Sequence, residues 1–159
     1  MSKIRYALAG AALFVASPAF ALDVDESADI KASPAKVWET IGDFCGIGNW
    51  HPAVEKCELG EDAGVATRTL TLAGGGGTLV EALVSRDEAG MTYTYKILSG
   101  PLPVDNYQST ITVKADGETS EVDWVGTFDA KGTSDAEAEK VITGIYESGL
   151  KAIGEKSAM

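Results

Sequence analysis

Hydrophobic and polar residues alternate along most of the stretch between Val54 and Asp129, with turn residues between the alternating segments. A period of two is typical of strands with one buried face, so this stretch predicts six consecutive strands. Four glycines at 74–77 lie between two of these segments. No helix start follows them, so we interpret them as a flexible hairpin connection and not as a phosphate-binding loop. Gly-Pro-Leu-Pro at 100–103 separates a later pair of strands.

A short helix is predicted ahead of these strands. Ser33 is a suitable N-cap, Pro34 suits the first helical position, and Gly42 ends the segment. A second short turn is expected over 45–50, and Pro52 ends it. The apolar residues of the first helix fall at helical spacing: Val37, Trp38 and Ile41.

The last segment of the chain predicts a long amphipathic helix. Ser134 and Glu137 form the capping box S-x-x-E at its start. Gly144 and Gly149 lie inside the helix, where small residues allow the sheet or a ligand to come close, and plain packing is the simpler reason. The apolar stripe consists of Ala138, Val141, Ile142, Ile145, Tyr146 and Ile153.

With a strand before Ser33, the predicted order is strand, two short helices, six strands and a long helix. This order predicts an α+β fold in one domain over residues 22–159, with a curved seven-stranded antiparallel sheet. Such a sheet must cover its apolar face, and the C-terminal helix is the element left to do so. A sheet wrapped around one helix often leaves a cavity between them.

The first 21 residues carry the pattern of a secretory signal peptide. Lys3 and Arg5 precede a small-apolar run at 7–16, and Ala19 and Ala21 occupy the small-residue positions of an A-x-A cleavage site. The run is too short to span a bilayer. We expect cleavage after Ala21 and a mature protein that is periplasmic or secreted, with no stable membrane anchor. ATP, NAD(P)H and nucleic acid are then poor candidates for partners.

The net charge of the predicted mature protein further limits the classes of partner that are expected. Residues 22–159 hold 11 Lys and Arg against 24 Asp and Glu, a formal charge of −13. This charge disfavours nucleic acid and anionic membranes and allows attraction to a basic protein surface. Solubility is the other explanation of the acidic composition, and it requires no basic partner.

Cys45 and Cys57 are the two cysteines of the chain. In an oxidising compartment an even count predicts a disulfide, with two free thiols or a reactive cysteine as the alternatives. The chain has one histidine and no C-x-x-C motif, so no metal site and no cofactor are expected. The histidine, His51, is more typical of a capping or packing residue than of a catalytic base.

Strand alternation predicts which side chains face the cavity, and two charged residues break the apolar pattern. Arg68 shares a face with Leu70 and Leu72, and Glu81 lies between Leu79 and Leu83. Opposite charges on adjacent strands offset each other, so we expect an inward ion pair. The alternative register turns Val80, Ala82 and Val84 inward and Glu81 to solvent. The other inward sets are Met91, Tyr93, Tyr95 and Ile97; Tyr107, Ser109, Ile111 and Val113; and Val122, Trp124, Gly126 and Phe128.

These residues resemble the START-like superfamily of the polyketide cyclase/dehydrase type 2 kind, whose fold is the helix-grip or Bet v 1-like fold. The segment at 30–38 (IKASPAKVW), the Gly-Asp-Phe at 42–44 and the Trp-His-Pro-Ala-Val at 50–54 carry the resemblance, which extends from about Val24 to Lys156. These motifs identify the fold better than the activity. Among its members, the chain looks most like small exported bacterial proteins regarded as accessory to periplasmic methanol oxidation.

The pattern Cys45, Trp50, Pro52 and Cys57 also looks similar to lachrymatory-factor-synthase-like proteins of plants. Those proteins use an Arg and a Glu on neighbouring strands, with tyrosines, inside the cavity. The resemblance implies Arg68, Glu81 and Tyr107 as the corresponding positions here.

Three functions follow as hypotheses. The first is binding of a small apolar or amphipathic molecule, with Arg68 and Glu81 orienting its polar group. The second is a cyclase, dehydrase or isomerase with Glu81 as general acid/base, Arg68 tuning it and Tyr107 as a hydrogen-bond donor, although a Glu paired with Arg keeps a low pKa. The third is an accessory protein for a periplasmic redox enzyme and its cytochrome. The expected ligand-binding residues are Trp50, His51, Arg68, Glu81, Tyr93, Tyr95, Tyr107, Trp124, Phe128, Ile142, Ile145 and Tyr146.

Overall fold

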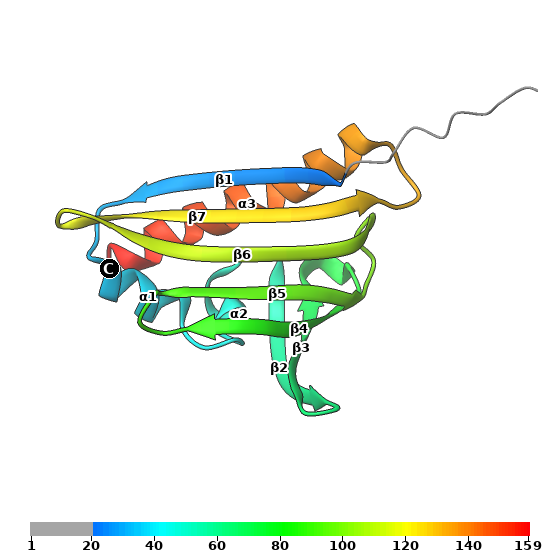
Figure 1. Ribbon diagram of the computed structural model, residues 1–159, viewed down its shortest axis with the longest axis horizontal. Helices are drawn as coiled ribbons and strands as arrows, with labels where there is room; N and C mark the ends of the chain where they lie inside the picture. The colour runs from blue at the N-terminus through cyan, green and yellow to red at the C-terminus, as the bar shows by residue number, and fades with distance from the viewer. Residues whose placement is uncertain (1–20) are drawn as a thin grey trace, which may run out of the picture.

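The computed structural model describes residues 21–159, and the predicted signal peptide lies outside these residues except for Ala21. The helices and strands follow the predicted order (Figure 1). They are β1 (Leu22–Ile30), α1 (Pro34–Ile41), α2 (Ile47–Trp50), β2 (Val54–Asp62), β3 (Val65–Leu72), the 3-10 turn η1 (Ala73–Gly75), β4 (Thr78–Asp87), β5 (Thr92–Ser99), β6 (Val104–Asp116), β7 (Thr119–Ala130) and α3 (Asp135–Ser157).

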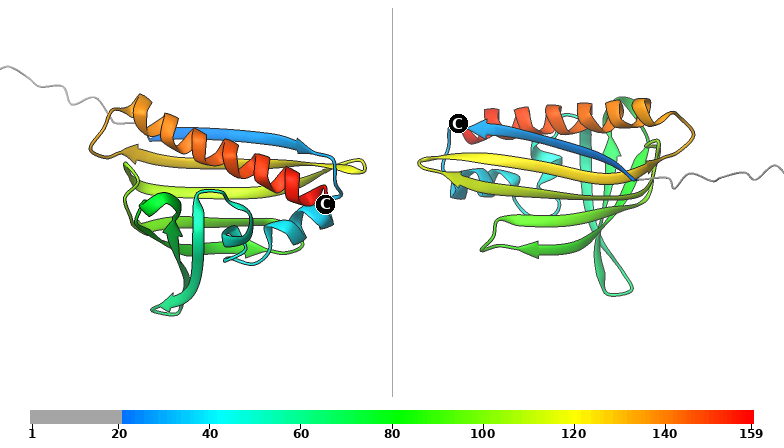
Figure 2. Two further views of the ribbon diagram at one scale, coloured as in Figure 1. Left: turned by 180° about the vertical axis from the view of Figure 1, so that it is seen from behind. Right: turned by 45° about the horizontal axis from the view of Figure 1, so that its top comes forward.

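Seven antiparallel strands form one sheet in the order β1-β7-β6-β5-β4-β3-β2. β1 and β2 are therefore the two edges. Strands β2 to β7 pair in their sequence order, and β1 pairs with β7. The long helix α3 runs across one face of this curved sheet, beside β1 and β7 (Figure 2). The predicted α+β fold is confirmed, and the core lies between the sheet and α3.

The short helix α1 is capped as its sequence predicts. The Oγ of Ser33 accepts a hydrogen bond from the backbone N–H of Lys36, and Pro34 occupies the first helical position. Gly42 ends the helix with a φ of 72°, a conformation that favours glycine. The following turn is fixed by Asp43, whose Oδ1 accepts from the backbone N–H of Cys45.

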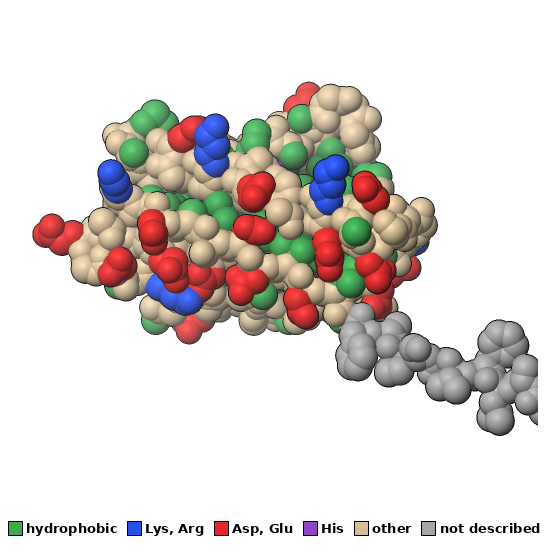
Figure 3. Space-filling model, turned by 90° about the horizontal axis from the view of Figure 1, so that it is seen from above, with side chains coloured by type: hydrophobic (Ala, Val, Ile, Leu, Met, Phe, Trp, Pro, Cys, Tyr) green, Lys and Arg blue, Asp and Glu red, His purple; other side chains and the backbone are tan. Residues whose placement is uncertain are grey.

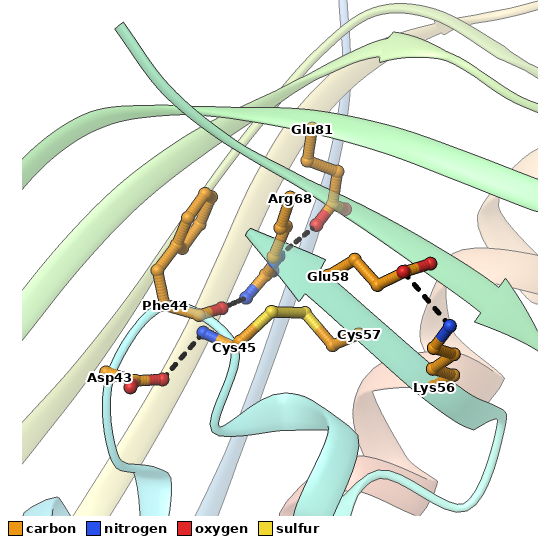
Figure 4. The surroundings of a disulfide bond; sticks show 8 residues. All are labelled: Asp43, Phe44, Cys45, Lys56, Cys57, Glu58, Arg68 and Glu81. Atoms are coloured by element: carbon orange, nitrogen blue, oxygen red, sulfur yellow. Dashed lines mark hydrogen bonds and ion pairs between the residues drawn. A yellow bond between two sulfur atoms is a disulfide. The ribbon is translucent and has the colours of Figure 1, made fainter. Parts of the chain in front are cut away.

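A disulfide joins Cys45, in the loop between α1 and α2, to Cys57 on the edge strand β2 (Figure 4). The pairing confirms the predicted bond and excludes free thiols at these two positions. The bond closes a loop over a sequence separation of 12 residues and ties the helical segment to the edge of the sheet.

Helix α3 begins at the predicted cap, since the Oγ of Ser134 accepts from the N–H of Glu137. The predicted stripe is correct with one exception: Val141 is 38% exposed, because it lies at the edge of the apolar face. The fully buried face of the helix consists of Ala138, Ile142, Tyr146, Gly149, Leu150, Ile153 and Ser157.

The two glycines of α3 differ in their surroundings. A Cβ on Gly149 would lie 2.6 Å from the ring of Trp124 and 2.8 Å from the Cδ2 of His51. A Cβ on Gly144 would have no atom within 4 Å. Gly149 therefore allows the sheet and the loop after α2 to approach the helix, which confirms packing as its reason, whereas Gly144 has no close neighbour.

Asp and Glu side chains are spread over the face viewed in Figure 3, in agreement with the acidic composition. In the part of the chain that the structure describes, no helix has the length and hydrophobicity needed to cross a membrane.

The two glycines give a matched pair of substitutions. Gly144→Ala removes backbone freedom from the unfolded chain, so we expect the free energy of unfolding to rise by about 0.5–1 kcal/mol. In Gly149→Ala the new methyl group pushes against Trp124 and His51, so we expect the free energy of unfolding to fall by about 1–3 kcal/mol. Urea denaturation measures both. Equal effects of the two substitutions would contradict the close approach at Gly149.

Candidate functional site

A cavity of about 230 Å³ lies between the inner face of the sheet, the loop after α2 and helix α3. Most of its wall is apolar, and strands β3, β4, β5, β6 and β7 all contribute to it. The lining residues are Ile47, His51, Ala53, Val54, Leu70, Leu72, Ala73, Gly76, Glu81, Tyr95, Ile97, Leu102, Tyr107, Trp124, Ile142 and Ile145.

Burial distinguishes the mouth of this cavity from its floor. Ala53, Ala73 and Gly76 are exposed and lie outside the strands and α-helices, so they lie at the mouth. The buried lining residues form the floor, and its polar members are Glu81, Tyr95, Tyr107, His51 and the indole of Trp124. The cavity is thus an apolar chamber with polar groups at its inner end, as small-molecule sites commonly are.

Arg68 on β3 and Glu81 on β4 lie directly opposite each other in the sheet register. The Nε of Arg68 donates to the Oε2 of Glu81 at 2.6 Å, and the two residues are 0% and 3% exposed. The predicted inward ion pair is therefore confirmed. The alternative register is wrong, since Val84 is exposed and Glu81 is buried.

The guanidinium of Arg68 is held on several sides. Its Nη1 donates to the backbone carbonyl of Phe44 at 2.6 Å, and its Cζ lies 4.2 Å from the ring centre of Phe44 and 4.9 Å from that of Tyr95. Phe44 precedes Cys45, so the disulfide fixes the loop that supplies this carbonyl (Figure 4). Because these groups enclose Arg68, it lies behind the wall and does not line the cavity, whereas Glu81 does.

Burial raises the pKa of the Glu81 carboxyl above its ordinary value, and the charge of Arg68 opposes this rise. The low pKa expected from the pairing alone is therefore not found, because the carboxyl loses nearly all of its solvent. The Nε of Arg68 still donates to the carboxylate at a distance typical of a charge-assisted hydrogen bond.

Aromatic hydroxyls form a connected chain beside the ion pair. The indole Nε1 of Trp124 donates to the hydroxyl of Tyr95 at 3.1 Å, and the hydroxyls of Tyr107 and Tyr146 lie 2.6 Å apart. Tyr146 donates to the Oγ of Ser109 at 2.8 Å. Burial raises the pKa of Tyr146 to about 12 and those of Tyr95 and Tyr107 well above their ordinary value, so all three are neutral phenols at pH 7.

Gly126 allows this chain to form. A Cβ at Gly126 would lie 2.1 Å from the hydroxyl of Tyr146. The absence of a side chain on β7 therefore lets the tyrosine of α3 reach the sheet and bond to Tyr107 and Ser109.

His51 is buried, with a packing role and a place in the cavity wall. Its Nε2 donates to the carbonyl of Ile145 at 3.0 Å, and its Nδ1 accepts from the N–H of Ala53 at 3.1 Å, which fixes the neutral tautomer. Burial lowers the pKa of His51 below 6.5, the Ile145 hydrogen bond opposes the shift, and the charge of Arg68 adds to it. His51 thereby joins α3 to the loop at the mouth.

A model of the family described as polyketide cyclase / dehydrase and lipid transport matches residues 21–158. The chain belongs to this family. A comparison with curated proteins found no match.

Solved structures agree with this membership of the cyclase/dehydrase and lipid transport family. The protein XoxI from Bacillus cereus is 38% identical, with a TM-score of 0.79 over 86% of this chain and 95% of that chain. An uncharacterized protein from Bacillus thuringiensis is 36% identical, with a TM-score of 0.80 over 87% of this chain and 100% of that chain. The Zhui aromatase/cyclase from Streptomyces sp. R1128 is 19% identical, with a TM-score of 0.70 over 87% of this chain and 94% of that chain, and shows the shared fold.

Seven of the twelve expected ligand-binding residues line the cavity of this family member: His51, Glu81, Tyr95, Tyr107, Trp124, Ile142 and Ile145. The other five do not line it: Trp50, Arg68, Tyr93, Phe128 and Tyr146. They face the correct side of their elements, but packing against other core residues covers them. Trp50, for example, donates from its Nε1 to the carbonyl of Ile41.

Nine lining residues were not among the expected ligand-binding residues. Strand alternation places three of them, Leu70, Leu72 and Ile97, on inward faces. No sequence pattern indicated the loop residues, because their position depends on how the loops fold back over the mouth. The unexpected residues are Ile47, Ala53, Val54, Leu70, Leu72, Ala73, Gly76, Ile97 and Leu102.

Removing one partner of the ion pair tests its role in stability. Arg68→Met leaves the Glu81 carboxyl buried without its cation, so we expect the free energy of unfolding to fall by about 3–5 kcal/mol in urea denaturation at pH 7.5. The double variant Arg68→Met/Glu81→Leu leaves no unpaired charge and should recover most of that loss. A single variant as stable as the parent would show that the pair is not buried as described.

Acid titration tests the state of His51. Because its folded pKa lies below 6.5, the unfolded chain binds a proton at His51 before the folded chain does. We expect stability to fall as the pH drops below about 6.5, relative to a His51→Gln variant measured in parallel between pH 7.5 and 5.5. His51 is the one histidine of the chain, so the difference reports on it alone. Parallel pH profiles of the two proteins would contradict the lowered pKa.

Proposed function

We propose that this protein is exported and binds a small apolar or amphipathic molecule in the cavity between the sheet and α3. The observation that carries the proposal is a chamber of about 230 Å³ whose wall is mostly apolar and whose floor holds a few polar groups. Membership of a family described as polyketide cyclase / dehydrase and lipid transport supports a ligand-binding role.

The size of the cavity limits the ligand. Apolar cavities of about 150 Å³ hold benzene, so a cavity of about 230 Å³ suits a molecule of about ten non-hydrogen atoms. Long acyl chains and multi-ring polyketides are too large to be enclosed in this space. A ligand of one ring with a short substituent, or a short branched chain, fits it.

Export is supported by two independent features. The N-terminal 21 residues have the composition of a signal peptide, and the Cys45–Cys57 disulfide is typical of an oxidising compartment. We therefore place the binding activity in a periplasm or outside the cell.

Catalysis is a second candidate for the same cavity. The raised pKa of Glu81 favours it, since a carboxyl that titrates closer to neutral pH is a better general acid/base. Tyr107 lines the cavity and Arg68 bonds to the carboxylate, as the cyclase-type hypothesis requires. A third candidate, an accessory role beside a periplasmic methanol-type dehydrogenase and its cytochrome, draws support from the 38% identity to XoxI and from the acidic charge.

Native mass spectrometry of the mature protein purified from a periplasm, followed by solvent extraction, tests ligand binding. We expect a bound molecule of about ten non-hydrogen atoms to accompany the protein. Ile97→Trp fills the chamber and should abolish this adduct. Leu98→Trp changes the next residue of β5, which is 45% exposed and lies outside the cavity, and should retain it.

The possible results separate the candidates. An adduct lost in Ile97→Trp and kept in Leu98→Trp supports binding in the cavity. An extracted molecule that the protein converts to another mass supports the enzyme. A protein without an adduct that binds a basic redox protein at low ionic strength supports the accessory role and contradicts the proposal.

A further inference from the structure

Hydrogen-bond directions along the tyrosine chain follow from the acceptors at its end. The Oγ of Ser109 donates to the carbonyl of Val125 at 2.9 Å, since a carbonyl can only accept. Ser109 must therefore accept from Tyr146, which uses the one hydrogen of that phenol. The hydroxyl of Tyr107, 2.6 Å from that of Tyr146, must then donate to it.

This assignment leaves one weakly used donor at the floor of the cavity. Tyr95 already accepts from Trp124, whose indole N–H can only donate. The hydrogen of Tyr95 has only the hydroxyl of Tyr107 to point to, at 3.4 Å, which is longer than a normal O–H···O bond of about 2.5–3.0 Å. Tyr95 therefore presents a weakly used donor to the cavity.

Glu81 supplies an acceptor on the same floor. Its Oε2 bonds to Arg68, and among the described residues its Oε1 makes no hydrogen bond. Glu81 lines the cavity, and its charge is close enough to Tyr95 to contribute to the raised pKa of that phenol. The floor thus offers one weakly used donor, the Tyr95 hydroxyl, and one anionic acceptor atom, the Oε1 of Glu81, that makes no hydrogen bond among the described residues.

We propose that the ligand is an uncharged apolar molecule with one hydroxyl, which accepts from the Tyr95 phenol and donates to the Glu81 carboxylate. This inference rests on the proposed function and specifies its ligand class, a small phenol or alcohol. A hydroxyl matches the floor because it is both donor and acceptor. A ketone or ether lacks the donor, and a hydrocarbon lacks both.

Anionic ligands are disfavoured by the same arrangement. Glu81 lines the cavity with its negative charge, whereas Arg68 is 0% exposed and enclosed by Phe44 and Tyr95. A carboxylate ligand would meet the anion of the pair without reaching the cation.

A set of size-matched probes tests the inference on the disulfide-bonded mature protein at pH 7.5. The probes are 4-propylphenol, 4-propylanisole, propylbenzene and 4-propylbenzoate, each of about ten non-hydrogen atoms. Isothermal titration calorimetry gives the affinities. We expect 4-propylphenol to bind about tenfold or more tightly than the ether and the hydrocarbon, because only it satisfies both groups, and 4-propylbenzoate to bind most weakly.

Variants separate the hydroxyl contact from the apolar cavity. Tyr95→Phe should lower the affinity for 4-propylphenol about fivefold and leave the affinity for propylbenzene unchanged. Tyr93→Phe is the matched control, since Tyr93 faces the same side of β5 but does not line the cavity, and should change neither affinity. Thermal unfolding of each variant checks that it is folded.

The outcomes distinguish this inference from the proposed function. Equal affinity for the phenol, the ether and the hydrocarbon, or tighter binding of the benzoate, would overturn the hydroxyl preference while leaving ligand binding in place. Failure of all four probes to bind would overturn both. The comparison of probes on the parent protein keeps the test decisive even where Tyr95→Phe does not fold.

Discussion

A buried guanidinium is costly unless its charge is matched, and Arg68 draws three parts of the chain together around its charge and two of its three nitrogens, while its Nη2 has no hydrogen-bond partner among the described residues. Strand β3 carries the arginine, β4 supplies Glu81, and the loop between α1 and α2 supplies the Phe44 carbonyl. The disulfide then ties that loop to β2. The edge of the sheet, the helical segment and the polar floor of the cavity are therefore fixed by one connected set of contacts.

The cavity is a consequence of how the sheet meets α3. Gly149 and Gly126 bring the helix and its Tyr146 close to the sheet at two positions, and the hydrogen-bonded chain through Tyr107 holds them there. Nearer the start of the helix, Ile142 and Ile145 face the chamber. One half of the interface is closely packed and the other half encloses the cavity. The polar groups therefore lie at the inner end of the cavity.

Family membership and local chemistry answer different questions about this protein. The fold is shared with the Zhui aromatase/cyclase at 19% identity, a level at which one scaffold supports many activities. The present chain has a small chamber with one anionic acceptor and one weakly used phenol donor. These groups favour recognition of a single polar function on an apolar molecule.

Alternation and capping in the amino-acid sequence predict the strands, the helices and most of their buried faces, because both are local properties of the chain. The sequence also indicated the ion pair, since a charge on an apolar strand face needs a partner on the next strand. The tertiary structure alone decided that Arg68 lies behind the wall, that Tyr146 bonds to Tyr107, and that loop residues such as Ala73 form the mouth. These features depend on distances between elements, which the curvature of the sheet and the approach of α3 set and no local pattern encodes.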